Sequence, residues 1–244
     1  MKSYVISVVN NKLSYESAQK TIISAKNIGG VEVELWNGFH KNQAKDLLKK
    51  HQFKILDYDV HWTQFQHFEP AISCFFSHYY LWEYCVELNE RIMILEHDAL
   101  FHKKFIDYDF EGVMNIGEPN QWQIQKQKFD FDNIYKKRTQ EGLIERNCTC
   151  KEKKYEYGGC HCIEYFLQGA HSYVITPNAS KNLITKAKTK GILPADFHIN
   201  RENIKISDSF PYCVHANQTF SLIHKEVHDG RDVKIPKGDI AWND

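Results

Sequence analysis

Short runs of β-branched and other apolar residues alternate with amphipathic stretches through the first sixty residues, and this alternation limits the possible folds most. The expected strands are residues 4–9, 31–36 and 53–58, and the expected helices are residues 15–27 and 42–51. Ser14 is expected to cap the first helix, and Gly29 with Gly30 to end it. Strands and helices that alternate at this spacing predict an α/β fold with a mostly parallel sheet and helices on both faces.

The same alternation resumes after residue 70. The expected elements are helices at 71–89 and 178–188, the second ended by Gly191, and strands at 91–95, 113–116 and 173–176. Residues 120–165 lose the periodicity and carry clustered cysteines, so they are expected to form a Cys-rich, basic insertion. A length of 244 residues fits one domain over residues 1–244 with a large core.

The overall charge gives no support for a nucleic-acid or membrane partner. The chain has 31 Lys and Arg against 31 Asp and Glu, so its net charge gives no reason to expect a nucleic-acid or membrane partner. The N-terminal apolar run is too short for a signal peptide. The most apolar long stretch, residues 71–88, contains His78, Glu83 and Glu87, so no membrane span is expected. A cytoplasmic location follows as the expectation.

Glu96, His97 and Asp98 directly follow the apolar run Arg-Ile-Met-Ile-Leu at residues 91–95. Acidic residues after a buried strand lie at the carboxyl edge of an α/β sheet, where such folds bind ligands. The carboxylates of Glu96 and Asp98 could hold a hard divalent cation that bridges the phosphates of a nucleotide. The alternative is a solvated turn or a helix cap, and the triplet alone favours neither.

Three segments together resemble glycosyltransferase family 25, which includes bacterial lipooligosaccharide galactosyltransferases and collagen galactosyltransferases. The first is Cys74-Phe75-Phe76-Ser77-His78 with Trp82, which matches the family's Cys-x-x-Ser-His helix. The second is Ile92 to Asp98, which matches its apolar strand ending in Glu-Asp-Asp. The third is Gly169 to Thr176 with Ala179 and Leu183, followed by Pro194-Ala195-Asp196, which matches its Gly-x-x-x-Tyr-x-Ile-Ser and Pro-x-Asp segments.

The resemblance implies a GT-A fold and an inverting transfer of a hexose such as galactose from a nucleotide-sugar donor, UDP by expectation, to a hydroxyl of a glycan. It implies Mn²⁺, or Mg²⁺, held by Glu96 and Asp98. The residues that it suggests for donor or substrate binding are Asn10, Ser77, His78, Glu96, Gly169 and Tyr173.

The chain departs from the family pattern at three positions. His97 replaces the central Asp of the acidic triplet, Asn10-Asn11-Lys12 replaces an Arg-rich turn, and Ser73 replaces a Gly. A missing carboxylate leaves room for a third metal ligand, for which His97, His215 and His224 are candidates. It also leaves open a metal-free, lectin-like protein.

Asp196 is the expected catalytic base. Pro194 holds the chain extended before it, and Leu193 and Phe197 supply apolar surroundings that could raise its pKa. Its alternative roles are hydrogen bonding to a sugar and capping of the following helix, and His198 is a second candidate for the base.

Four cysteines, Cys148, Cys150, Cys160 and Cys162, lie within fifteen residues of one another. Four thiolates suit a tetrahedral structural Zn²⁺ site, with His161 as a substitute ligand. A structural zinc would hold together an insertion that otherwise lacks a core. Two disulfides and four free thiols are the alternatives.

Residues 121–154 carry nine Lys and Arg against five acidic residues, interleaved with aromatic side chains. A solvated surface explains this charge. A site for an anionic acceptor, including nucleic acid, is the alternative. The second function that we consider is therefore a nucleic-acid-binding protein, or a glycosyltransferase that modifies DNA.

Overall fold

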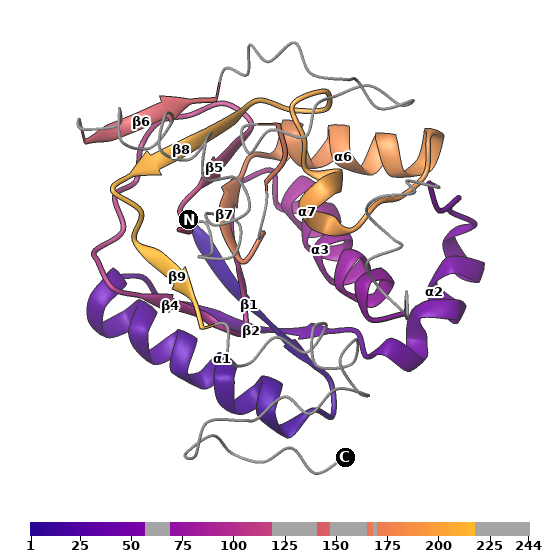
Figure 1. The fold of residues 1–244 in the computed structure, drawn as a ribbon, viewed down its shortest axis with the longest axis horizontal. Coiled ribbons are helices and arrows are strands. Elements are labelled where there is room, and N and C mark those ends of the chain that lie inside the picture. The colour runs from indigo at the N-terminus through magenta and orange to yellow at the C-terminus, as the bar shows by residue number, and fades with distance from the viewer. Residues whose placement is uncertain (57–68, 119–140, 147–164, 168–169, 218–244) are drawn as a thin grey trace, which may run out of the picture.

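The structure is a computed structural model that describes residues 1–56, 69–118, 141–146, 165–167 and 170–217. Its centre is a seven-stranded sheet in the order β2-β1-β3-β7-β5-β8-β6 (Figure 1). The strands of this sheet are β1 (Lys2–Val8), β2 (Glu34–Gly38), β3 (Ile92–Glu96), β5 (Val113–Asn115), β6 (Gly142–Glu145), β7 (Ser172–Ile175) and β8 (Ile206–Phe210). A separate two-stranded ribbon pairs β4 (Ala99–Phe101) with β9 (Val214–Ala216).

The sheet is mixed, with most strands in one direction. β1 runs parallel to both β2 and β3, and β5 runs parallel to β8. β7 is antiparallel to its neighbours β3 and β5, and β6 is antiparallel to β8. Five of the seven strands therefore share a direction, which confirms the expected mostly parallel α/β sheet. The carboxyl ends of β1, β2 and β3 meet at one edge of the sheet.

Alternation along the strands sends apolar side chains to both faces. In β3, Ile92 and Ile94 join one core cluster, and Met93 and Leu95 join the other. The first core is covered by α2 (Ala44–His51), α3 (Glu69–Leu88), α6 (Pro177–Thr189) and α7 (Ala195–His198), and the second by α1 (Lys12–Ser24) and the β4–β9 ribbon (Figure 1). Helices thus cover both faces, as the sequence predicts.

The first helix begins three residues earlier than expected. Asn11 is its N-cap, and the Asn11 side-chain oxygen accepts a hydrogen bond from the Ser14 backbone N–H at 3.0 Å. The Ser14 hydroxyl instead accepts a hydrogen bond from the Val8 N–H at 2.8 Å. The prediction of Ser14 as the cap is wrong, because Ser14 ties the helix back to β1. After Ser24 the chain continues as a π-helical turn, Ala25–Gly29.

The expected third strand is also wrong in its described part, residues 53–56. Ile55 makes an isolated parallel bridge to Ile192, beside the main sheet. Strands β4, β8 and β9, and also β6, were not expected from the sequence. The bounds of α3, β3, β5, β7 and α6 lie within two residues of the expected ones.

Several predictions lie outside the described residues. They concern the four clustered cysteines, Gly169, His224 and most of the basic stretch. Within the described part of the chain, no helix is both long and apolar enough to cross a membrane.

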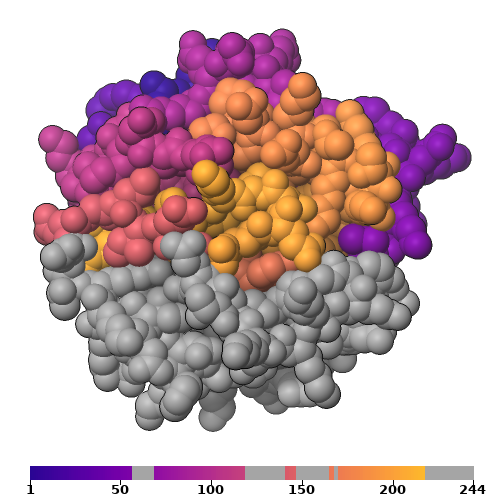
Figure 2. Space-filling view, turned by 90° about the horizontal axis from the view of Figure 1, so that it is seen from above, coloured from indigo at the N-terminus to yellow at the C-terminus, as the bar shows by residue number. Residues whose placement is uncertain are grey.

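A buried ion pair holds the far edge of the sheet. Arg146 and Asp208 are 3% and 0% exposed, and two guanidinium nitrogens donate to the Asp208 carboxylate at 2.9 and 2.6 Å. Asn115 donates to the same carboxylate at 2.8 Å, and Arg146 also donates to the Phe166 carbonyl at 2.6 Å. The contact between β6 and β8 is visible in Figure 2, where residues 141–146 in red lie beside the yellow C-terminal strands.

Loss of this ion pair is expected to be costly. Arg146→Met leaves a buried, uncompensated carboxylate, so the free energy of unfolding should fall by about 3–5 kcal/mol. Urea unfolding monitored by circular dichroism measures this fall. Lys205→Met is the matched control, because Lys205 bonds Glu111 on the surface and should leave the midpoint nearly unchanged. Equal midpoints for both variants would contradict the role of the buried pair.

The burial of His198 predicts that the folded protein loses stability in acid. Burial lowers the pKa of this side chain to about 4, against an ordinary value of 6.5. Between these two values the unfolded chain binds a proton that the folded chain excludes, so the free energy of unfolding falls as the pH drops from 6.5 to 4. His198→Phe should flatten this dependence in urea titrations at several pH values. The same slope in the variant would contradict the assignment.

Candidate functional site

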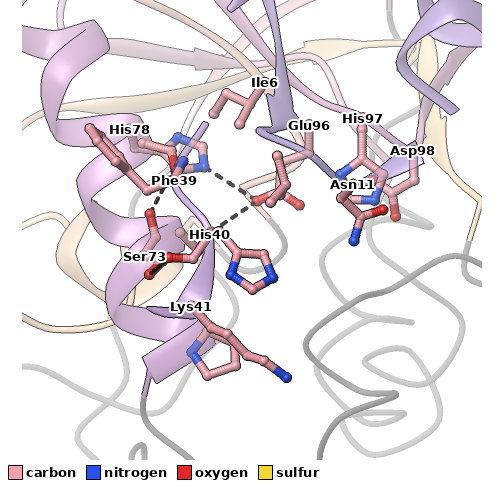
Figure 3. A pocket seen from close by; sticks show the side chains of 14 residues that line it. Ile6, Asn11, Phe39, His40, Lys41, Ser73, His78, Glu96, His97 and Asp98 are labelled. Atoms are coloured by element: carbon pink, nitrogen blue, oxygen red, sulfur yellow. Dashed lines mark hydrogen bonds and ion pairs between the residues drawn. The ribbon is translucent and has the colours of Figure 1, made fainter. Parts of the chain in front are cut away.

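A cleft of about 740 Å³ that is open to solvent lies at the carboxyl edge of β1, β2 and β3 (Figure 3). Ile6 and Val8 come from β1, and Glu96 ends β3. Phe39, His40 and Lys41 follow β2, and the N-terminal half of α3 forms another wall. This is the edge at which the sequence places a ligand site, because parallel strands end there together.

One face of α3 supplies five lining residues, Pro70, Ser73, Cys74, Ser77 and His78. Successive members are three, one, three and one positions apart, which places them on one side of the helix. The Ser77 hydroxyl donates to the Ser73 carbonyl at 2.8 Å and accepts from the Phe39 N–H at 2.9 Å. Ser77 therefore fixes the segment that follows β2, so its contribution to the site is to hold the cleft wall.

Close packing at the end of β2 depends on a glycine. A Cβ atom on Gly38 would lie 2.6 Å from the Ile6 side chain and 3.3 Å from the Ser77 hydroxyl oxygen. A larger residue would push β2 away from α3 and β1. The segment Phe39 to Lys41 reaches the cleft because Gly38 permits this approach.

Glu96 forms a cluster with two residues of α3. Its Oε1 lies 3.3 Å from His78 Nε2 and 3.7 Å from the Cys74 sulfur. Figure 3 shows His78 and Glu96 pointing toward one another, with His97 and Asp98 on the other side of Glu96. The backbone N–H of Glu96 donates to the His171 carbonyl at 2.7 Å, which fixes the end of β3.

Tyr173 contacts His78 and is not among the residues that line the cleft. The Tyr173 hydroxyl is 2.8 Å from His78 Nδ1 and accepts from the Trp82 N–H at 3.0 Å. The His78 and Tyr173 rings stack at 5.8 Å between centroids. Tyr173 is fully buried, so the structure places it behind His78, where it orients the imidazole.

Asp98 lies at the bottom of the cleft and is 7% exposed. Among the described residues, no hydrogen-bond partner lies within reach of its Oδ1. Burial, together with the nearby charge of Glu96, raises the pKa of Asp98 to about 6 against the opposing effect of His97. A buried carboxylate oxygen in this state would gain from a cation.

The pKa of Glu96 shifts in the opposite direction. Burial alone would raise it, but the hydrogen bond and charge of His78, with the charges of His97 and His171, lower it below the ordinary range. The two carboxylates at the edge of the sheet therefore differ in pKa, with Glu96 below the ordinary range and Asp98 above it.

Asp196 lies in the first turn of α7, after the N-cap residue Pro194. The Asp196 carboxylate accepts a hydrogen bond from the Phe197 backbone N–H at 3.1 Å, so the alternative in which it caps this helix stays open. The charges of Glu96, Asp196 and Asp98 all act on Cys74, whose thiol pKa is raised well above its ordinary value, first by burial. Asp196 is not among the residues that line the cleft, although its charge acts on Cys74 in the cleft wall. His198, the second candidate for the base, is fully buried and contacts the Leu183 carbonyl at 3.0 Å.

The remaining candidates fall in different places. Asn10 is exposed in a left-handed turn (φ 60°), and its neighbour Asn11 lines the cleft. His97 lines the cleft, whereas His215 lies on the β4–β9 ribbon, with its ring 5.4 Å from that of His102. His97 is therefore better placed than His215 as a further ligand.

Sequence reasoning missed His40 and Lys41 as cleft residues. Both residues follow β2, which is parallel to β1. Ligands bind at the carboxyl ends of parallel strands, so this rule could have predicted that the two residues line the cleft. They add a basic group and an imidazole to the wall opposite the acidic residues (Figure 3).

Comparison with solved structures gives a weak match. The chain is similar to the crystal structure of the glycosyltransferase GlyE in Streptococcus pneumoniae TIGR4, at 9% sequence identity and a TM-score of 0.34. The match covers 86% of this chain and 45% of that one, so the chain spans less than half the length of GlyE. No curated protein matches the chain.

Comparison with protein families gives a match over most of the chain. The model of glycosyltransferase family 25, described as an LPS biosynthesis protein, matches residues 1–199. The matched region contains the cleft, the acidic triplet, α3 and Asp196. It confirms the family that the three motifs indicate. The chain belongs to glycosyltransferase family 25.

Proposed function

We propose that this protein is a metal-dependent, inverting glycosyltransferase that moves a hexose from a UDP-sugar donor to a hydroxyl group of a glycan. The observation that carries the proposal is that Glu96 and Asp98 both line an open cleft of a family 25 chain. The family description names LPS biosynthesis, which favours a glycan acceptor.

The residues at the cleft suit a hard divalent cation such as Mn²⁺ or Mg²⁺. Asp98 contributes a buried carboxylate oxygen that has no hydrogen-bond partner among the described residues, and Glu96 contributes a second carboxylate. Oxygen ligands are the ones that these ions prefer. A bound cation would neutralise the diphosphate leaving group of the donor.

The protein's own groups divide the remaining work. Lys41 and His40 are positioned to bind anionic oxygens of the donor from the opposite wall. Asp196 would accept the proton of the acceptor hydroxyl as that oxygen attacks the anomeric carbon. Attack on the face opposite the leaving diphosphate gives inversion.

Removal of the buried carboxylate tests the metal site. Asp98→Asn should abolish Mn²⁺-dependent UDP binding, because an amide oxygen does not supply the negative charge. Isothermal titration with UDP, with Mn²⁺ and with EDTA, measures the effect. Asp109→Asn is the matched control, because Asp109 is exposed before β5 and outside the cleft. Equal UDP binding in EDTA, or normal binding by Asp98→Asn, would contradict the metal dependence.

A change at Asp196 tests the base. Asp196→Asn keeps the shape and hydrogen-bonding reach of the side chain but cannot accept a proton at neutral pH. Turnover with a UDP-sugar and a glycan acceptor should fall on the order of 10²–10⁴-fold, with donor affinity nearly unchanged. A fall in donor affinity at retained turnover would make Asp196 a sugar-binding residue instead.

A further inference from the structure

Three side chains of different chemistry converge on one point at the wall of the cleft. They are the Cys74 sulfur, His78 Nε2 and Glu96 Oε1, and these donor atoms all lie within 4.8 Å of one another. Cys74 and His78 are four positions apart on α3, and Glu96 ends β3. A helix and a strand distant in the sequence thus present a thiol, an imidazole and a carboxylate to the same space.

The separations between the donor atoms match a tetrahedral zinc site. With ordinary Zn–N, Zn–O and Zn–S bond lengths, two ligands at a tetrahedral angle lie about 3.3 Å apart for nitrogen and oxygen, and about 3.5 Å apart for sulfur and oxygen. The observed distances are 3.3 Å from His78 Nε2 to Glu96 Oε1 and 3.7 Å from the Cys74 sulfur to Glu96 Oε1. The third separation, between the Cys74 sulfur and the His78 imidazole, lies within 4.8 Å.

The surroundings of the cluster favour a cation. The carboxylates of Glu96 and Asp98 line the same cleft as Cys74 and His78. Two carboxylates at this position attract a positive ion. Binding of the ion would displace the thiol proton of Cys74, as happens at thiolate sites in general.

A buried partner orients the imidazole. The Tyr173 hydroxyl lies 2.8 Å from His78 Nδ1 and can accept its N–H, which leaves the Nε2 lone pair directed at Cys74 and Glu96. A hydrogen bond to the second ring nitrogen is the usual support for a histidine that binds a metal. Trp82 donates to Tyr173 at 3.0 Å and holds this hydroxyl in place.

We propose that Cys74, His78 and Glu96 form a binding site for Zn²⁺, or a cation of similar softness, in the wall of the cleft. All three residues line the open cleft, so an ion can enter, and three protein ligands would leave a fourth coordination position free. Glu96 is shared with the oxygen-rich pair for Mn²⁺, and the thiolate and imidazole ligands distinguish the zinc site from that pair. The site rests on three donor atoms and does not depend on the proposed sugar transfer.

The amount of zinc bound per chain tests whether the site exists, and it is measured on the whole chain of 244 residues. After dialysis against Zn²⁺ and removal of the free ion, Cys74→Ser should hold one zinc per chain less than the wild type by elemental analysis. Cys213→Ser is the matched control, because Cys213 is also a free thiol but lies in the other core, and it should lose none. The difference between these variants does not depend on any zinc held by the clustered cysteines at residues 148–162.

Cobalt provides a second measurement on the same proteins. Replacement of Zn²⁺ by Co²⁺ should give a thiolate-to-cobalt charge-transfer band that is weaker in Cys74→Ser than in Cys213→Ser. Glu96→Gln, which keeps the shape of the side chain, should also lose one metal ion. Tyr173→Phe should retain the site but lower its zinc affinity about 10–100-fold.

Equal zinc content in the wild type, Cys74→Ser and Glu96→Gln would overturn the proposal. The cluster would then be a set of hydrogen bonds in which His78 and Cys74 donate to Glu96. Asp98→Asn separates this outcome from a failure of the proposed function. That variant should keep the zinc ion while it loses Mn²⁺-dependent UDP binding.

Discussion

The site depends on the burial of α3, whose polar side chains must find partners inside the protein. Ser77 and His78 are 2% and 0% exposed, and an unpaired polar group in such a position costs about 1–3 kcal/mol. Ser77 meets this requirement with the backbone of residues 73 and 39, and His78 with Tyr173 and Glu96. Apart from Ser73, which lies on α3 itself, the partners lie after β2, on β7 and on β3, so the same hydrogen bonds that satisfy α3 also assemble the cleft.

This requirement separates two roles that the family motif combines. Ser77 and Tyr173 use their hydroxyl groups on protein partners, so they build the site, whereas Glu96, Asp98, His40 and Lys41 face the open space. His78 stands between the two groups, because one ring nitrogen contacts Tyr173 and the other contacts Glu96. The family motifs therefore contain residues that hold the cleft together as well as residues that could contact a ligand.

The parts of the fold predicted from the sequence are those set by local pattern. The apolar run before Glu96 predicts a buried strand, and the rule for parallel strands predicts the edge at which the cleft lies. β8 escaped prediction because Ser207, Asp208 and Ser209 suggest an exposed turn. They are buried because Arg146, about sixty residues earlier, neutralises Asp208, and no local pattern reports such a partner. The cap at Asn11 was missed for a related reason, since Ser14 had a second possible partner in Val8.

The carboxylates of Glu96 and Asp98, at the end of β3, lie in different surroundings although only one residue separates them. Successive side chains of an extended chain point to opposite sides, so residues 96 and 98 start on the same side and His97 on the other. The chain turns after Glu96, which carries Asp98 to the bottom of the cleft and leaves Glu96 beside α3. Glu96 thereby gains His78 and a lowered pKa, whereas Asp98 gains burial and a raised one. Replacement of the family's central Asp by His97 fits this arrangement, because a third carboxylate would raise the pKa of Asp98 further, whereas the imidazole opposes that rise.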